Sequence, residues 1–295
     1  MCAETVHDHH PEAIISTDEL AAILDDEGLR IYDCTVYLHQ RESGADAPYV
    51  VESGRADYEA GHIPGSDFLD VVDDLSVPDA PTRFMMPAAD RFAGAVGAVG
   101  LGDGCRVVLY SRGTSMWATR VWWMLRAVGF DAAVLDGGFE RWRDEDRPLS
   151  SDPAIYPPAT LTPKPRDGLF VGHDAVQAAI GEAGSVTVNA LLPELHRGDS
   201  ARYGRPGRVP GSVNIPYAAL LEGDTKTFVD LGVARDRLEA AGVTADKKVI
   251  AYCGGGIAAT LDAFIMHRLG YTDITVYDAS MSEWAMDESL PIETD

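Results

Sequence analysis

Short apolar, β-rich runs alternate with helix-like stretches along most of this chain. Four runs fall in the first half and four in the second, at residues 29–34, 66–70, 106–110 and 132–135, and then at 185–189, 212–215, 248–252 and 274–277. Runs of this length separated by helical patterns are typical of parallel sheets covered by helices. The hydrophobic pattern therefore predicts an α/β fold with a parallel sheet in each half.

Prolines cluster between the two halves, at Pro148, Pro153, Pro157, Pro158, Pro163 and Pro165. Proline fixes φ and cannot continue a helix or a central strand, so the cluster indicates a stiff, extended linker. We therefore expect a first domain at residues 12–147, a linker at 148–167 and a second domain at 168–292.

The second half repeats the first at a fixed distance. Five residues recur 142 positions later: Tyr110, Ser111, Arg126, Asp136 and Trp142 correspond to Tyr252, Cys253, Arg268, Asp278 and Trp284. A shared offset at five positions indicates an internal duplication. The chemical difference between the copies is that Ser111 stands where the second half has Cys253.

Cys253 follows an apolar run and precedes Gly254, Gly255 and Gly256, after which a helix-like segment extends from Ile257 to about His267. The first N–H groups of a helix have no intrahelical partners, and glycines let a loop turn its amides inward. We expect the amides of Gly254, Gly255, Gly256, Ile257 and Ala258 to surround the sulfur, which favours a thiolate and an anionic persulfide. The alternative is a buried structural cysteine beside a tight turn.

At these residues the chain resembles the tandem-domain rhodanese family of sulfurtransferases. The resemblance extends from about residue 15 to 290 and is carried by segments 61–65, 120–124 and 135–139 in the first half, and by 210–216, the Cys253 loop, 277–280 and Glu283-Trp284 in the second. It implies two rhodanese-like domains, each a parallel sheet flanked by helices, with a non-catalytic first domain and a catalytic second domain.

The resemblance also implies a reaction. A sulfane sulfur moves from thiosulfate or 3-mercaptopyruvate to a thiophilic acceptor through a persulfide on Cys253, at a site between the domains. The acceptor is cyanide in an assay, or a thiol such as that of thioredoxin, and neither a cofactor nor a metal is required.

The residues around the expected site depart from the family pattern. Thiosulfate-using relatives usually carry basic residues where Gly254 and Gly255 stand, and Leu191 and Leu192 stand where the family places substrate-binding arginines. Arg202, Arg205 and Arg208 follow shortly afterwards and are candidates to bind an anionic donor; the alternative is a solvated basic turn.

His62, in the first Pro-Gly motif, is a candidate to reach the site from the other domain. Its alternative role is that of a turn residue whose ring hydrogen-bonds the backbone. Asp33 and Asn189, at the ends of equivalent strands, are expected to cap the turns that follow. The tryptophans at positions 122, 123, 142 and 284 are expected to pack in the core and the interface.

Two rival classes of function remain open. A cysteine-dependent phosphatase can share this fold, but that chemistry needs an arginine six positions after the cysteine, where this chain has Ala259. A non-catalytic binding or regulatory protein is the second rival, because the loop lacks cations.

Charge argues against nucleic acid as a partner. The 295 residues include 47 acidic and 24 basic ones, a formal net charge of −23 that repels a phosphate backbone. The same charge repels an anionic donor, so arginines, helix N-termini and amides must make the entrance to the site locally positive.

The four cysteines, Cys2, Cys34, Cys105 and Cys253, have no disulfide-like or zinc-like spacing, which suits a reducing compartment. No apolar run is long enough to span a membrane, and residues 1–11 are too polar for a signal peptide. We therefore expect a cytoplasmic protein without a membrane partner. Cys2 with His7, His9 and His10 is a weak metal-binding pattern, for which a frayed terminus is the preferred interpretation.

Overall fold

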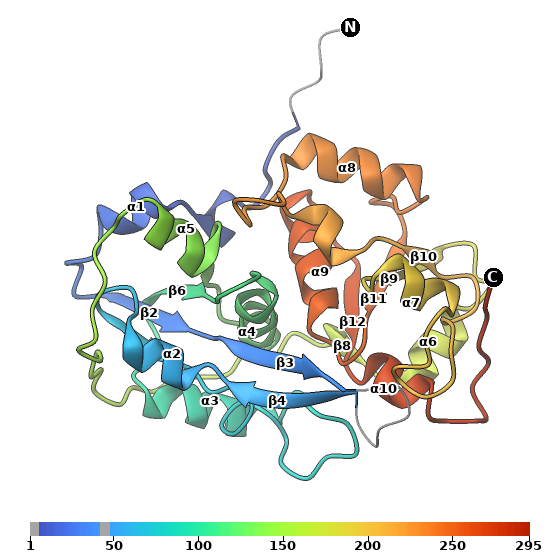
Figure 1. The fold of residues 1–295 in the computed structure, drawn as a ribbon, viewed down its shortest axis with the longest axis horizontal. Coiled ribbons are helices and arrows are strands. Elements are labelled where there is room, and N and C mark those ends of the chain that lie inside the picture. Colours follow the sequence, from blue (N-terminus) through green and yellow to red (C-terminus); the bar gives the residue numbers. More distant parts are fainter. Residues whose placement is uncertain (1–5, 42–47) are drawn as a thin grey trace, which may run out of the picture.

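The computed structural model describes residues 6–41 and 48–295, which contain two five-stranded sheets with helices around them (Figure 1). Each sheet is parallel throughout. The first has the order β1 (Ile14–Ile15), β7 (Ala133–Leu135), β6 (Arg106–Tyr110), β2 (Leu29–Asp33) and β5 (Ser66–Phe68). The second has the order β10 (Val213–Asn214), β9 (Ser185–Asn189), β11 (Lys248–Tyr252), β12 (Ile274–Tyr277) and β8 (Phe170–Val171).

Read from the opposite edge, the second sheet repeats the first, because β8, β12, β11, β9 and β10 take the places of β1, β7, β6, β2 and β5. The α/β fold with a parallel sheet in each half is thus confirmed. All eight expected strands are present, four of them with the expected bounds. The two-residue edge strands β1 and β8 were missed, since so short a run carries no periodic pattern.

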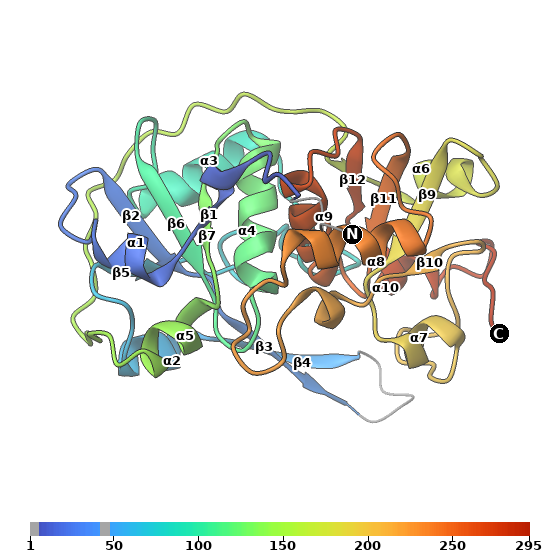
Figure 2. The same ribbon diagram turned by 90° about the horizontal axis from the view of Figure 1, so that it is seen from above.

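The helices and 3₁₀ turns of the first half are η1 (Pro11–Ala13), α1 (Thr17–Ala21), α2 (Arg55–Ala60), α3 (Ala89–Ala98), α4 (Met116–Ala127) and α5 (Gly138–Asp144). Those of the second are α6 (His173–Ala179), α7 (Pro193–Arg197), η2 (Tyr217–Leu220), α8 (Leu231–Ala240), α9 (Ala258–Arg268) and α10 (Ser280–Trp284). A hairpin of β3 (Val36–Gln40) and β4 (Tyr49–Ser53), also not expected, projects from the first half towards the second (Figures 1 and 2).

Helices α4 and α9 lie side by side where the halves meet, as both views show (Figures 1 and 2). The Trp122 ring meets the Phe264 ring edge-on at 4.9 Å, and the hydroxyls of Thr119 and Thr260 are 3.1 Å apart. All four tryptophans expected in the core are buried. The interface is therefore packed like a protein interior.

Two carboxylates fasten the halves together in a symmetric way. Asp136 accepts a hydrogen bond from the amide of Phe228 at 2.9 Å, and Asp278 accepts one from the amide of Met86 at 2.7 Å. Since Asp136 and Asp278 are equivalent in the repeat, each half holds a loop of the other in the same manner.

The chain between α5 and β8 forms no helix or named strand and arches from one half to the other in Figure 2. It follows the first half closely: the Ala159 amide donates to Gly97 at 2.9 Å, and the Lys164 amide to Val128 at 2.7 Å. The limits 12–147, 148–167 and 168–292 stay predictions. Across the described ranges, none of the helices combines the length and the apolar character needed to cross a bilayer.

Candidate active site

Cys253 follows β11, the central strand of the second sheet, and is only 2% exposed. Ligands of open parallel sheets bind beyond the carboxyl ends of the strands, and β11 delivers the thiol to that edge. Helix α9 begins five residues later, at Ala258, close to the expected start. The strand, loop and helix arrangement expected around Cys253 is therefore present.

Ser280 holds the loop in shape. Its hydroxyl oxygen accepts hydrogen bonds from the amides of Cys253 at 3.0 Å and Gly256 at 3.1 Å, and it donates to the carbonyl of Tyr277 at 2.7 Å. Ser280 has a φ of +52°, an uncommon value for serine that aims its side chain into the loop. Ser280 lies in the segment 277–280 that carries the family resemblance, but spacing alone does not predict this contact.

The cradle of amides is smaller than expected. The amides of Gly254, Gly255, Ile257 and Ala258 have no acceptor among residues 6–41 and 48–295. Gly256 is the exception, because its amide is committed to Ser280. Four N–H groups, two in the loop and two at the start of α9, are thus free to face an anionic sulfur, rather than five.

The space around the three loop glycines shows where glycine is required and where a side chain would fit. A Cβ at Gly254 would overlap the Tyr203 side chain, and one at Gly256, where φ is +73°, would overlap the carbonyl of Asp278. At Gly255 the nearest atom to a Cβ is the Ser282 hydroxyl, at 3.8 Å. Close packing therefore requires glycine at two of the positions, while Gly255 leaves space open beside the thiol.

Cys253 lines a cavity of about 1030 Å³ to which both halves contribute. The first half supplies side chains from the β3–β4 hairpin, from residues 81–84 and from Met116 at the start of α4. Leu191 and Leu192 line it on the side of the second half, so the leucines that replace the expected arginines face the site. The cavity lies between the halves, where the resemblance placed the site.

Three arginines, Arg41, Arg83 and Arg202, line this cavity, and its described lining includes no Asp or Glu. Arg202 also donates to the side-chain oxygen of Gln40 at 3.1 Å, across the interface. In a chain with a net charge of −23, this composition makes the cavity a local region of positive charge. Arg41 and Arg83 were missed because they come from irregular segments of the first half, which no motif links to Cys253.

Arg205 and Arg208 are placed elsewhere. The Arg205 guanidinium donates to four backbone carbonyls, those of Trp284, Ala285, Asp287 and Leu290. Arg208 pairs with Glu293 and, at 2.7 Å, with Asp295. Both side chains fasten the C-terminal segment, so of the three candidate arginines only Arg202 reaches the cavity.

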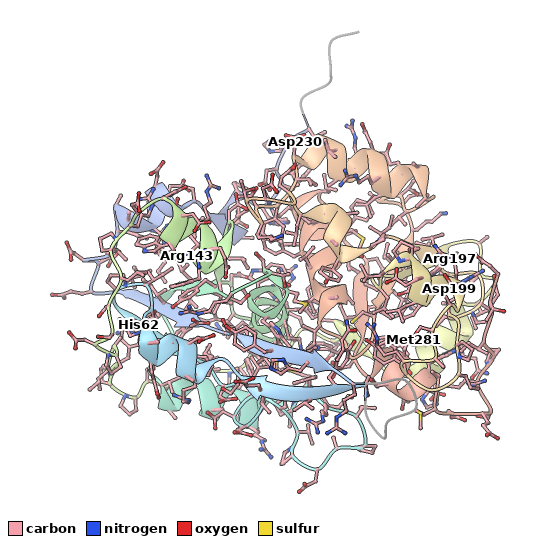
Figure 3. The ribbon with its side chains drawn as sticks, in the orientation of Figure 1. His62, Arg143, Arg197, Asp199, Asp230 and Met281 are labelled. Carbon is pink, nitrogen blue, oxygen red and sulfur yellow. The ribbon has the colours of Figure 1, made fainter. Side chains whose placement is uncertain are left out.

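His62 does not reach the cavity either. Its Nδ1 lies 2.8 Å from the carbonyl of Tyr58 and its Nε2 lies 3.0 Å from that of Asp152, and its ring stacks on Tyr58. Figure 3 shows His62 on the far side of the first half from Met281, whose amide donates to the carbonyl of Cys253. His62 is therefore a turn residue whose ring hydrogen-bonds the backbone, and it does not line the substrate cavity.

Arg120, which is fully buried on α4, reaches from the first half into the Cys253 loop. It donates to Asp278 at 2.7 Å, to the carbonyl of Gly256 at 3.1 Å and to the carbonyl of Phe84. The first half therefore clamps the loop directly. Sequence reasoning noted Arg120 only as part of a motif.

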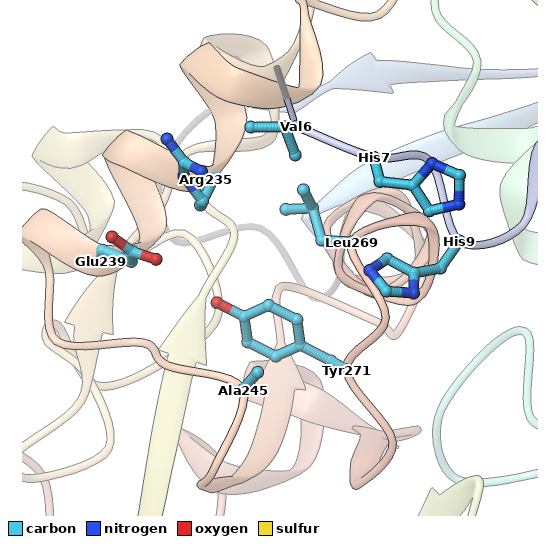
Figure 4. Close-up of a pocket in the computed structure, with 8 residues that line it drawn as sticks. All are labelled: Val6, His7, His9, Arg235, Glu239, Ala245, Leu269 and Tyr271. Carbon is cyan, nitrogen blue, oxygen red and sulfur yellow. The ribbon is translucent and has the colours of Figure 1, made fainter. Parts of the chain in front are cut away.

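A second cavity, of about 300 Å³, lies beneath the N-terminal segment and is lined by His7, His9, Arg235, Glu239 and Tyr271, among others (Figure 4). It is separate from the Cys253 cavity. Cys2 lies outside the described residues, and inside them no three His, Cys, Asp or Glu side chains gather closely enough to hold a metal ion.

A family model described as a rhodanese-like domain matches residues 16–145 and again residues 196–287. Two matches in one chain agree with the two sheets, and together they cover well over half of its length.

Curated relatives match along nearly the whole chain. The 3-mercaptopyruvate sulfurtransferase of Homo sapiens is 31% identical, over 88% of this chain and 85% of its own. The 3-mercaptopyruvate sulfurtransferase of Escherichia coli strain K12 is 29% identical, over 95% of this chain and 97% of its own. The mitochondrial thiosulfate/3-mercaptopyruvate sulfurtransferase 1 of Arabidopsis thaliana is also 29% identical, over 96% of this chain and 78% of its own.

Solved structures share the fold. The crystal structure of SseA from Escherichia coli superposes with a TM-score of 0.76 at 24% identity, covering 91% of this chain and 98% of SseA. An anaerobic ergothioneine biosynthesis enzyme from Chlorobium limicola superposes with a TM-score of 0.80 at 20% identity, covering 97% of this chain and 71% of that enzyme.

Proposed function

The chain belongs to the rhodanese-like domain family and is a sulfurtransferase, and on that premise we propose that Cys253 carries the sulfur as a persulfide. The observation that supports this most directly is the position of Cys253 in a positively charged cavity. Beside it lie the amides of Gly254, Gly255, Ile257 and Ala258, which have no acceptor in the described part of the chain. The donor is thiosulfate or 3-mercaptopyruvate, and the acceptor is cyanide in an assay or a thiol, such as that of thioredoxin, in the cell.

The reaction has two steps. The Cys253 thiolate attacks the outer sulfur of the donor, and sulfite or pyruvate leaves. The acceptor then attacks the outer sulfur of the persulfide and restores the thiolate. Amides that point at a sulfur anion stabilise it in both states, as an oxyanion hole stabilises oxygen, and neither step needs a metal or a cofactor. We expect ping-pong kinetics, with parallel double-reciprocal plots.

Arg41, Arg83 and Arg202 favour an anionic donor at the entrance. A phosphatase would need an arginine to bind phosphate, but Ala259 occupies the required position in α9. The hydroxyl of the next residue, Thr260, donates to the carbonyl of Ile257 at 2.7 Å. The non-catalytic alternative predicts no covalent change at Cys253, so one measurement separates it from the enzyme. The free cysteines favour a reducing compartment, so the cytoplasmic location stays a prediction.

The test is the intact mass of the purified protein after brief exposure to thiosulfate or to 3-mercaptopyruvate. We expect a gain of one sulfur, about 32 Da, in the wild type and none in Cys253→Ser. The serine variant keeps the shape of the loop but lacks the soft nucleophile. A wild type that gains no sulfur from either donor would contradict the proposal and favour the binding-protein alternative.

A further inference from the structure

Two tyrosines, one from each half, meet beside the Cys253 loop. Tyr49 begins β4 of the hairpin in the first half, and Tyr203 lies in the segment between α7 and β10. Their hydroxyls are hydrogen-bonded, and their rings meet edge-on at 6.1 Å. Both side chains line the cavity that holds Cys253. The pair is thus a polar contact within the site that needs both halves of the molecule.

Tyr203 lies against the backbone of the residue that follows the cysteine. A Cβ at Gly254 would lie 2.6 Å from Cε1 of Tyr203 and would overlap its hydroxyl. The phenol therefore occupies the space that a side chain at position 254 would fill. Burial, reinforced by Tyr49, raises the pKa of Tyr203 well above its ordinary value. The hydroxyl keeps its proton throughout the physiological range and serves as a hydrogen-bond donor.

We propose that Tyr203 is a catalytic residue that donates a hydrogen bond, and then a proton, to the group that leaves the transferred sulfur, and that Tyr49 is its positioning residue. The proposal rests on the proposed function, since it needs Cys253 to be the nucleophile. It gives the first half a chemical part in the reaction, because Tyr49 comes from the hairpin.

The need for a proton differs between the two donors. With 3-mercaptopyruvate, the thiolate attacks sulfur, the sulfur–carbon bond breaks, and its electron pair stays on carbon as the enolate of pyruvate. Tyr203 gives its proton to that enolate and regains one from water through Tyr49. The Cys253 thiol releases one proton to water and the methyl group of pyruvate gains one from Tyr203, so cysteine thiol and mercaptopyruvate become persulfide and pyruvate and no oxidant is consumed. With thiosulfate, the electron pair of the broken sulfur–sulfur bond leaves on sulfite, a stable anion that needs no proton.

The experiment compares Tyr203→Phe, Tyr49→Phe and a control, Tyr37→Phe, by the rate of persulfide formation from each donor in single turnover. Tyr37 lies on β3 of the same hairpin, and its hydroxyl contacts Asp57 rather than the cavity. We expect Tyr203→Phe to slow the reaction of 3-mercaptopyruvate about 100-fold but that of thiosulfate less than about tenfold. Tyr49→Phe should show the same preference with a loss of about tenfold, and Tyr37→Phe should match the wild type.

Equal losses with both donors in Tyr203→Phe would overturn the inference, since a structural role would not distinguish the leaving groups. An unchanged rate with 3-mercaptopyruvate would overturn it too. A wild type that takes sulfur from thiosulfate but not from 3-mercaptopyruvate would overturn the inference alone, whereas a wild type that takes sulfur from neither would overturn the proposed function with it.

Discussion

The Ser111 loop and the Cys253 loop follow equivalent central strands, yet the space above them is used in opposite ways. The Ser111 hydroxyl donates to the carbonyl of Thr114 at 2.7 Å and accepts from the amide of Ala118 at 3.3 Å. Arg112 packs over the Phe139 ring at 3.6 Å, and its Nε lies 3.4 Å from Asp33. In the second half, Gly254 and Gly255 replace Arg112 and Gly113, and a cavity opens there. A repeated fold thus yields a filled loop and a reactive loop according to which side chains cover the end of the strand.

The helices that follow the two loops, α4 and α9, also differ in the contacts of one equivalent buried side chain. Arg120 on α4 and Asp262 on α9 occupy equivalent positions, 142 residues apart, and both are fully buried. Arg120 binds Asp278 and two carbonyls, whereas neither oxygen of Asp262 has a hydrogen-bond partner among the described residues. Arg120 therefore supports the catalytic loop from the first half, whereas Asp262 makes no corresponding hydrogen bond to the Ser111 loop among the described residues.

The largest effect should come from exchanging the two loop residues. We expect Cys253→Ser to lower sulfur transfer by more than about 10³-fold, because a hydroxyl is a poor nucleophile at neutral pH. Adding Ser111→Cys to that variant should restore nothing, since Arg112 covers the first loop and the 111 side chain is held by Thr114 and Ala118. The rate of sulfur transfer to cyanide is measured for the single and the double variant. Appreciable activity of the double variant would show that the side chains covering the Ser111 loop do not prevent catalysis.

Removing the clamp from the first half should have the next largest effect. Arg120→Met leaves the Asp278 carboxylate buried, with the amide of Met86 as its one remaining partner among the described residues. We expect the free energy of unfolding to fall by about 3–5 kcal/mol. Arg126→Met, on the same helix, is the control: its 3.8 Å pair with Asp131 is half exposed and should contribute less than about 1 kcal/mol. Urea unfolding compares them, and adding Asp278→Asn to Arg120→Met should recover part of the loss.

Replacing each of the three loop glycines by alanine should lower stability by an amount that depends on the atoms around it. Alanine at Gly256 meets both a positive φ and the Asp278 carbonyl, and alanine at Gly254 meets Tyr203, so each should cost about 1–3 kcal/mol of stability. Gly255→Ala has room and should change stability by less than about 1 kcal/mol. Thermal unfolding tests the order, and a loss at Gly255 equal to that at Gly254 would contradict the role given to Tyr203.

The sequence was informative wherever a pattern is local. Strands β6, β9, β11 and β12 have the expected bounds because each is an apolar run between polar turns, and Asp33 and Asn189 cap their turns, at 2.9 Å to the amide of Thr35 and 3.0 Å to that of Leu191. The glycines after Cys253 likewise indicated a close approach of the backbone, although they did not say that Tyr203 and Asp278 make it.

The sequence was uninformative where the site is assembled from distant segments. Arg41, Arg83 and Tyr49 lie more than 160 residues before Cys253 and reach the cavity only because the hairpin and residues 81–84 cross the interface. Arg205 and Arg208 were expected near the substrate because they precede the second Pro-Gly motif. Their partners in the C-terminal segment, such as Asp287 and Asp295, follow about 80 residues later and gave no local signal.

The effect with the smallest starting value, near zero in acid, concerns Asp262, the counterpart of Arg120. Burial raises its pKa well above the ordinary value, so above the pKa of the unfolded chain the folded state binds more protons at this carboxyl than the unfolded state. Stability from this group is therefore complete in acid and is lost as the pH rises, by up to about 1.4 kcal/mol per pH unit. Asp262→Asn, which cannot ionise, should match the wild type near pH 4 and exceed it increasingly towards pH 8 in urea unfolding. If the difference in the free energy of unfolding between Asp262→Asn and the wild type were constant across that range, the Asp262 carboxyl would have an ordinary pKa. Asp262 would then have a partner that stabilises its charge, and the contrast with Arg120 would fail.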